Sequence, residues 1–152
     1  MPPAPTEPHR LAATRVPASR LLEPLRAIAA ESMISARVNG NCMSPLLTDG
    51  ARIEIRPRRL YLPGDLLAFA HGSGTFFVHR FLGYAWAGRL LLVTQADSAS
   101  RRDGPVDPRQ VLGRVCGGEV PRRAVAIPPA DRLRAVGLWA KWGLCHLFRS
   151  RS

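Results

Sequence analysis

Lysine is almost absent from this chain. Lys141 is its only lysine, so the formal net charge of +11 comes almost wholly from arginine. A strongly basic chain favours anionic partners such as nucleic acid, an acidic membrane surface or an acidic peptide. Arginine richness also arises in a high-GC genome without any selection for binding. The charge therefore does not identify a partner by itself.

Cysteine is scarce as well. Cys42, Cys116 and Cys145 are odd in number, far apart, and show no Cys-x-x-Cys spacing. A disulfide framework and a cysteine-based metal site are both disfavoured by this pattern. We expect a protein of a reducing compartment in which a thiol stays free, with no metal and no cofactor.

Long apolar runs are missing too. No segment approaches the roughly 18–20 apolar residues that span a bilayer, and residues 1–9 contain no apolar core of a secretory signal. We expect a cytoplasmic protein. Peripheral contact with the inner membrane face stays open as an addition to that expectation.

What is present suggests one folded domain. The chain has 152 residues and is 46% hydrophobic, which is enough for a single core. Residues 1–17 hold several prolines and predict a flexible leader. The folded domain is expected over 18–127, and a basic amphipathic helix over 128–152.

The apolar pattern predicts a mainly β domain. A short helix is expected over 21–30, with hairpin turns at 71–74 and 83–88. Gly, Pro and Asp residues bound the segments with strand character, which predicts strands near 34–39, 51–56, 65–70, 75–83, 89–95 and 110–116.

The tail over 130–148 has helical periodicity. Its apolar face is wide because Trp139 and Trp142 extend it, and Lys141 is among the cations beside it. Such a helix can lie in a membrane interface, with contact through residues 131–149. We favour the alternative that it packs on its own domain or on a dimer partner.

The stretch from Gly40 to Pro45 carries the most chemical information. Cys42 supplies a nucleophile if its pKa is lowered by an imidazolium or by backbone amides. His79 lies on a later predicted strand and supplies an imidazole. The Cys42 amide and a donor near Gly40 or Asn41 would form an oxyanion hole.

The residues behind the nucleophile have structural roles in this interpretation. Met43 would fill the core and Pro45 would rigidify the turn, while Ser44 completes the groove around the site. Ser44 is also an alternative nucleophile if the register is shifted.

Six motifs in order resemble one family. The chain is similar to the signal peptidase I and LexA-type repressor peptidases over about residues 34–117 through Gly40-x-Cys42-Met43-x-Pro45, Asp49-Gly50, Pro63-Gly64-Asp65, Val78-His79-Arg80, Gln95-Ala96-Asp97 and Leu112-Gly113-Arg114-Val115. The resemblance implies a catalytic domain of coiled antiparallel strands. It also implies a peptidase whose substrate binds as an extended strand, with small side chains beside the cleaved bond.

The chain departs from the family pattern in three ways. Cys42 occupies the position of the family's serine, His79 occupies the position of the base, and Ala96-Asp97 replaces a Gly-Asp pair. The resemblance implies that Asp97 orients His79 as the third member of a triad, with Asp103 as the reserve candidate. Asp97 as a simple turn residue is an equal alternative.

We therefore expect a Cys-His peptidase that processes a leader or precursor peptide, or itself. One alternative is a catalytically inactive, peptide-binding homologue in which Cys42 is inert. Another is an electrostatic binder of nucleic acid or membrane, although no specific nucleic-acid surface is evident. The remaining cysteines and histidines are assigned no role: Cys116, Cys145, His9, His71 and His146.

Overall fold

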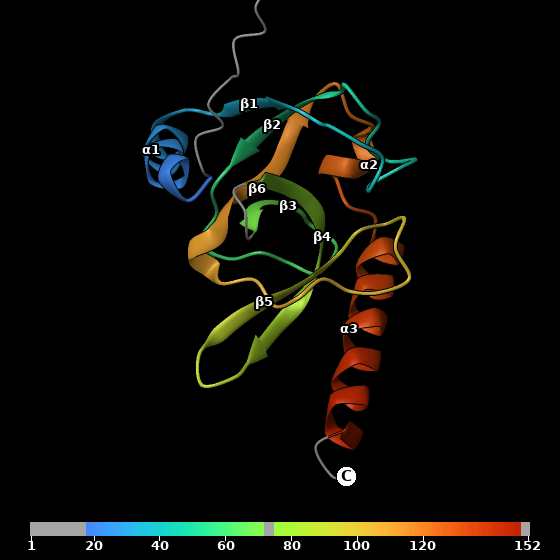
Figure 1. Ribbon diagram of the computed structural model, residues 1–152. Helices are drawn as coiled ribbons and strands as arrows, with labels where there is room; N and C mark the ends of the chain where they lie inside the picture. The colour runs from blue at the N-terminus through green and yellow to red at the C-terminus, as the bar shows by residue number, and fades with distance from the viewer. Residues whose placement is uncertain (1–17, 72–74, 150–152) are drawn as a thin grey trace, which may run out of the picture.

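The computed structural model describes residues 18–71 and 75–149. These residues form one six-stranded antiparallel sheet with helices at its sides (Figure 1). The strands are β1 (Ile34–Arg37), β2 (Arg52–Arg56), β3 (Leu66–His71), β4 (Thr75–Trp86), β5 (Leu90–Gln95) and β6 (Val111–Gly118). Their order across the sheet is β1-β2-β6-β3-β4-β5. The predicted mainly β class is confirmed.

Three α-helices and one 3-10 turn complete the described chain. They are α1 (Ala18–Glu31), η1 (Pro108–Gln110), α2 (Arg122–Val125) and α3 (Pro129–Arg149). The predicted leader over residues 1–17 lies outside the described residues, as does the centre of the predicted 71–74 turn. Strands β3 and β4 pair up to His71 and Thr75, so they flank that turn as a hairpin.

The predicted turn over 83–88 is placed too early. Strand β4 continues through Gly83 to Trp86, and the chain reverses around Gly88, whose φ is +72°. The register between β4 and β5 shifts between Phe81 and Gly83. Gly83 therefore marks an irregularity inside a strand, which sequence alone does not separate from a turn.

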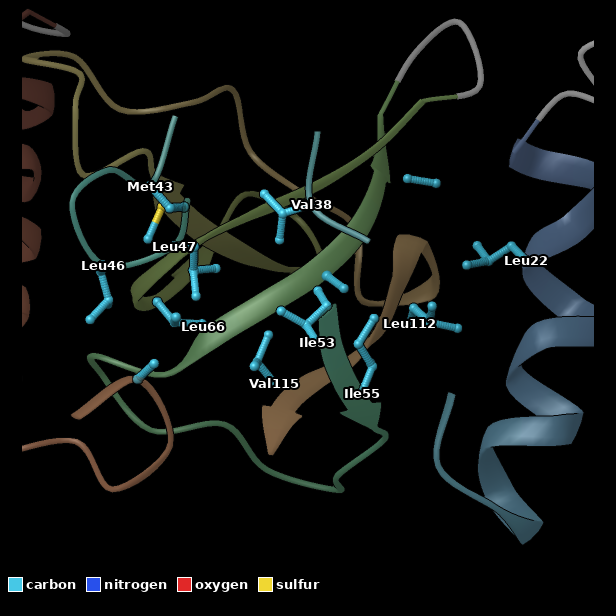
Figure 2. Packing of buried hydrophobic residues seen from close by; sticks show 13 residues of the cluster. Leu22, Val38, Met43, Leu46, Leu47, Ile53, Ile55, Leu66, Leu112 and Val115 are labelled. Carbon is cyan, nitrogen blue, oxygen red and sulfur yellow. The ribbon is translucent and has the colours of Figure 1, made fainter. Parts of the chain in front are cut away.

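Side chains alternate between the two faces of the sheet and form separate clusters. The larger cluster includes Leu66 and Ala68 of β3, and Leu22 of α1 reaches it from outside the sheet (Figure 2). A second cluster contains Leu67 and Phe69, which are the alternate residues of the same strand. Strand β3 thus has a core on both of its faces.

Helix α3 packs against β4 and β5. Its buried Ala135 meets Leu82 and Val93 of the sheet, and Trp139 Nε1 donates a hydrogen bond of 2.9 Å to the Tyr84 carbonyl. The tail helix therefore lies on its own domain, which is the interpretation that we favoured. Within 18–71 and 75–149, every helix is too short or too polar to cross a bilayer.

Gly83 makes this helix contact possible, and this generates a stability prediction. A Cβ at position 83 would lie 2.6 Å from Trp139 Cδ1, so Gly83→Ala must displace the indole ring. We expect it to lower the free energy of unfolding by about 1–3 kcal/mol, measured by urea denaturation.

Gly137→Ala is the matched control, because a Cβ there meets nothing within 4 Å on exposed helix α3. It should raise the stability by about 0.5–1 kcal/mol through helix propensity. Equal, small effects of both substitutions would show that the contact between Trp139 and Gly83 does not hold the helix.

Candidate active site

Three segments meet where the sequence predicted a site. They are the turn over 39–45, strand β4 at residues 78–80 and the loop over 96–103. The turn has a defined shape because Gly40 adopts φ +92° and its amide donates to Asp49 Oδ1 at 2.7 Å. Met43 is buried with 1% exposure, which fixes the turn to the core as expected (Figure 2).

Cys42 lies at the edge of this turn and is half-buried. Its thiol is 4.0 Å from the carbonyl oxygen of Val78, the residue before His79. Its own carbonyl accepts two hydrogen bonds from Ser98, one from the amide at 3.1 Å and one from the hydroxyl at 2.9 Å. The loop over 96–103 is thereby attached to the residue that carries the thiol.

The thiol is not activated in the way that we expected. Burial raises the pKa of Cys42 above its ordinary value, and the negative charges of Asp103 and Asp97 add to the increase. The amides of Cys42 and Met43 lower this pKa, but by less. The expectation of a lowered pKa is therefore wrong for this structure, because burial disfavours a thiolate and the carboxylates of the adjoining loop repel it.

His79 lies on β4 and is buried, with 7% exposure. Its Nδ1 is 2.6 Å from Asp103 Oδ2, and the same oxygen accepts a hydrogen bond of 2.7 Å from the buried Thr94 hydroxyl. The rings of Phe69 and Phe77 lie against the imidazole with centroid distances of 5.7 and 5.6 Å. The ring is therefore held by polar and aromatic contacts together.

The second ring nitrogen of His79 faces a different environment. Within the described residues Nε2 has no hydrogen-bond partner, and it is not one of the fully buried polar atoms that lack one. If Nδ1 carries the proton toward Asp103, Nε2 is left as an acceptor, which is the state that a general base needs.

Asp97 does not take the position beside His79 that we predicted. Both of its carboxylate oxygens accept hydrogen bonds of 2.7 Å from Arg80, and these bonds raise the pKa of that guanidinium more than burial lowers it. Side chains 79 and 80 leave opposite faces of β4. The acid that pairs with Arg80 therefore cannot also lie at His79, and the reserve candidate Asp103 does so instead.

Among the described residues, no hydrogen bond joins the side chains of Cys42 and His79, and the two side chains lie toward opposite faces of β4. Cys42 packs with the larger core cluster, together with Val78, whereas the His79 ring lies against Phe69 and Phe77 on the other face. The thiol approaches the strand at the main chain of residue 78. A direct dyad requires the thiol to leave the Val78 carbonyl and to reach the imidazole on the other face of β4.

The structure changes which backbone amides could form the oxyanion hole. The Gly40 amide is occupied by Asp49, and the Ser44 amide donates to the Asn41 carbonyl at 3.0 Å. The amides that face the thiol are those of Cys42 and Met43. Asn41 and Pro45 are exposed beside the turn, where they can contact a ligand.

Sequence analysis missed two contributors, Thr94 and Ser98. Both are common residue types, and only the folded loop shows that Thr94 holds Asp103 and Ser98 holds the turn. Among the side chains that the structure describes, no three from His, Cys, Asp or Glu gather as a metal site would require. No protein-family model matches the sequence, and no curated protein matches it either. What the structure defines is an antiparallel β domain in which a buried histidine is paired with a half-buried aspartate, on a strand that a thiol approaches.

The raised pKa of the thiol can be measured by alkylation. In a Cys116→Ser/Cys145→Ser background, the rate with iodoacetamide should rise with pH to a midpoint above the ordinary cysteine value of about 8.5. Asp103→Asn should move this midpoint down, because it removes a nearby negative charge.

The exposed Glu31→Gln substitution on α1 is the charge-matched control and should leave the midpoint unchanged. A midpoint well below 8.5 in the parent protein would contradict the geometry described above and restore the expectation of a pre-formed thiolate.

Proposed function

We propose that this protein is a cysteine peptidase of the signal peptidase and LexA type, acting on a leader or precursor peptide. The observation that carries the proposal is the partly buried contact of 2.6 Å between His79 and Asp103, on the strand that the Cys42 thiol approaches. Ser98 attaches the loop of Asp103 to the turn of Cys42. The resemblance of the ordered motifs supports the same assignment.

His79 would act as the general base in the first half of the reaction. Because the thiol is protonated at rest, attack requires that Nε2 take the proton from Sγ as Sγ bonds to the scissile carbonyl carbon. The amides of Cys42 and Met43 would stabilise the resulting oxyanion. Nε2 would then donate the proton to the leaving amine, the C–N bond would break, and a thioester would remain on Cys42.

Water would complete the reaction at the same nitrogen. Nε2 would take a proton from water as its oxygen attacks the thioester carbonyl, and the C–S bond would break with return of that proton to the sulfur. Asp103 would keep Nε2 free of a proton at the start of both halves by holding the Nδ1–H. Thr94 would act only as a positioning residue for Asp103.

A second candidate function is a catalytically inactive peptide-binding homologue. The specific observation in its favour is the resting contact of the thiol with the Val78 carbonyl, together with the raised pKa of Cys42. In that case the surface around Cys42 would bind an extended peptide without cleaving it. Cys42→Ala would then bind ligand as the parent does.

Substitution of Asp103 and Asp97, the two acids of the loop, tests the proposed peptidase activity. Purified protein is incubated with a pool of unstructured peptides rich in Ala and Gly, and mass spectrometry follows the cleavage products and the acyl adduct on Cys42. We expect Asp103→Asn to lower the cleavage rate by about 10²–10⁴-fold, because His79 loses its orientation. Cys42→Ala should abolish both the products and the adduct.

Asp97→Asn is the matched control, since it changes an acid in the same loop that binds Arg80 instead. We expect it to lower the stability and to keep most of the cleavage rate of the folded fraction. Cleavage that survives Cys42→Ala, or that depends on Asp97 and not on Asp103, would refute the proposed triad. No cleavage of any peptide, with ligand binding retained, would favour the inactive homologue.

A further inference from the structure

A concave surface lies between helix α3 and the hairpin of β4 and β5. Figure 1 shows where these elements lie in the fold. The surface is a groove of about 1110 Å³, which is as large as sites that enclose a drug-sized ligand. Buried Leu82 and Val93 contribute apolar lining from the sheet. The proposed chemistry at Cys42 and His79 makes no use of this space.

All three tryptophans of the chain line this groove. Trp86 comes from the hairpin with 75% exposure, Trp139 comes from α3 with 39% exposure, and Trp142 lies one turn further along the helix. Tryptophan, tyrosine and arginine are the residues most enriched where proteins bind one another tightly. Their concentration here is not needed to fill the core, because two of the rings remain exposed.

The charge of the groove is positive. Arg101, Arg102 and Lys141 line it and are exposed, and the Arg102 guanidinium lies 4.9 Å above the Trp142 ring. Asp103 is the one acidic residue among the described residues that line it, and its Oδ2 contacts His79 and Thr94. The groove therefore complements a ligand that is apolar along its length and carries carboxylates.

We propose that this groove binds an acidic, apolar segment of the peptide substrate away from the bond that is cleaved. The identity of the ligand as substrate rests on the proposed function, whereas the docking surface itself does not. Asp103 belongs to both the groove and the candidate site, so a bound segment would lie beside the site. A concave surface accommodates a peptide, whereas a bilayer surface would meet only its rim.

The test measures binding without cleavage. Cys42→Ala protein is titrated with a synthetic peptide that carries Leu and Phe at helical spacing and Glu and Asp between them, and tryptophan fluorescence is followed. A matched peptide has Gln and Asn at the acidic positions. We expect a blue shift and saturable binding with the acidic peptide, and binding about tenfold weaker with the neutral one.

Charge reversal locates the site. Arg101→Glu/Arg102→Glu should weaken binding of the acidic peptide by about tenfold or more, because both cations line the groove. Arg58→Glu/Arg59→Glu makes the same charge change at two adjacent exposed arginines outside it and should change the affinity less than about twofold.

The opposing results are distinct. Equal weakening by both double substitutions would mean diffuse attraction to a basic protein and would overturn the inference. So would a failure to bind the acidic peptide, or a fluorescence change only with vesicles that contain phosphatidylglycerol. Groove-specific binding by a protein whose parent form never cleaves would uphold the docking surface and reject the proposed function separately.

Discussion

A buried imidazole needs a hydrogen-bond partner. For His79 that partner is Asp103, and the path of the loop that carries Asp103 determines much of the geometry of the candidate site. His79 lies between aromatic rings with little access to water, where an unpaired ring nitrogen would cost about 1–3 kcal/mol. The loop after β5 folds back so that Asp103 reaches Nδ1. Thr94 fixes the loop through both its carbonyl, which accepts from the Asp103 amide, and its hydroxyl. Ser98, in the same loop, is thereby brought to the carbonyl of Cys42.

The path of the loop after β5 also gives Asp97 and Asp103 different partners. Alternation along β4 sends His79 and Arg80 to opposite faces, and each takes one carboxylate from the loop. Both carboxylates lie near enough to Cys42 to raise the pKa of its thiol. The site thus holds a thiol whose pKa is raised, so the proposed peptidase reaction would begin with proton transfer. This property separates it from cysteine sites that store a thiolate.

The sheet was predictable because its signals are local. Alternating apolar residues between Gly, Pro and Asp located all six strands to within a few residues, and the wide apolar face of the tail located α3. The turn predicted to begin at Gly83 was placed too early. Gly83 lies within β4 and leaves room for the Trp139 ring, and the sequence alone does not distinguish such a glycine from one in a turn. The prediction placed Asp97 beside His79, where the structure has Asp103. The two acids are six residues apart in one loop, and only the path of that loop decides which of them reaches His79. The contacts of Thr94 and Ser98 carry no sequence signal of their own.

The central claim is that Asp103 holds His79 with Nδ1 protonated and Nε2 free to accept a proton. Nitrogen-15 NMR of labelled imidazoles measures this directly, with the His79 signals assigned by their loss in His79→Gln. At a pH where the ring is neutral, the account predicts the tautomer that carries its proton on Nδ1, with a slowly exchanging Nδ1–H. A proton on Nε2, or a ring that averages freely between the two tautomers, would contradict it.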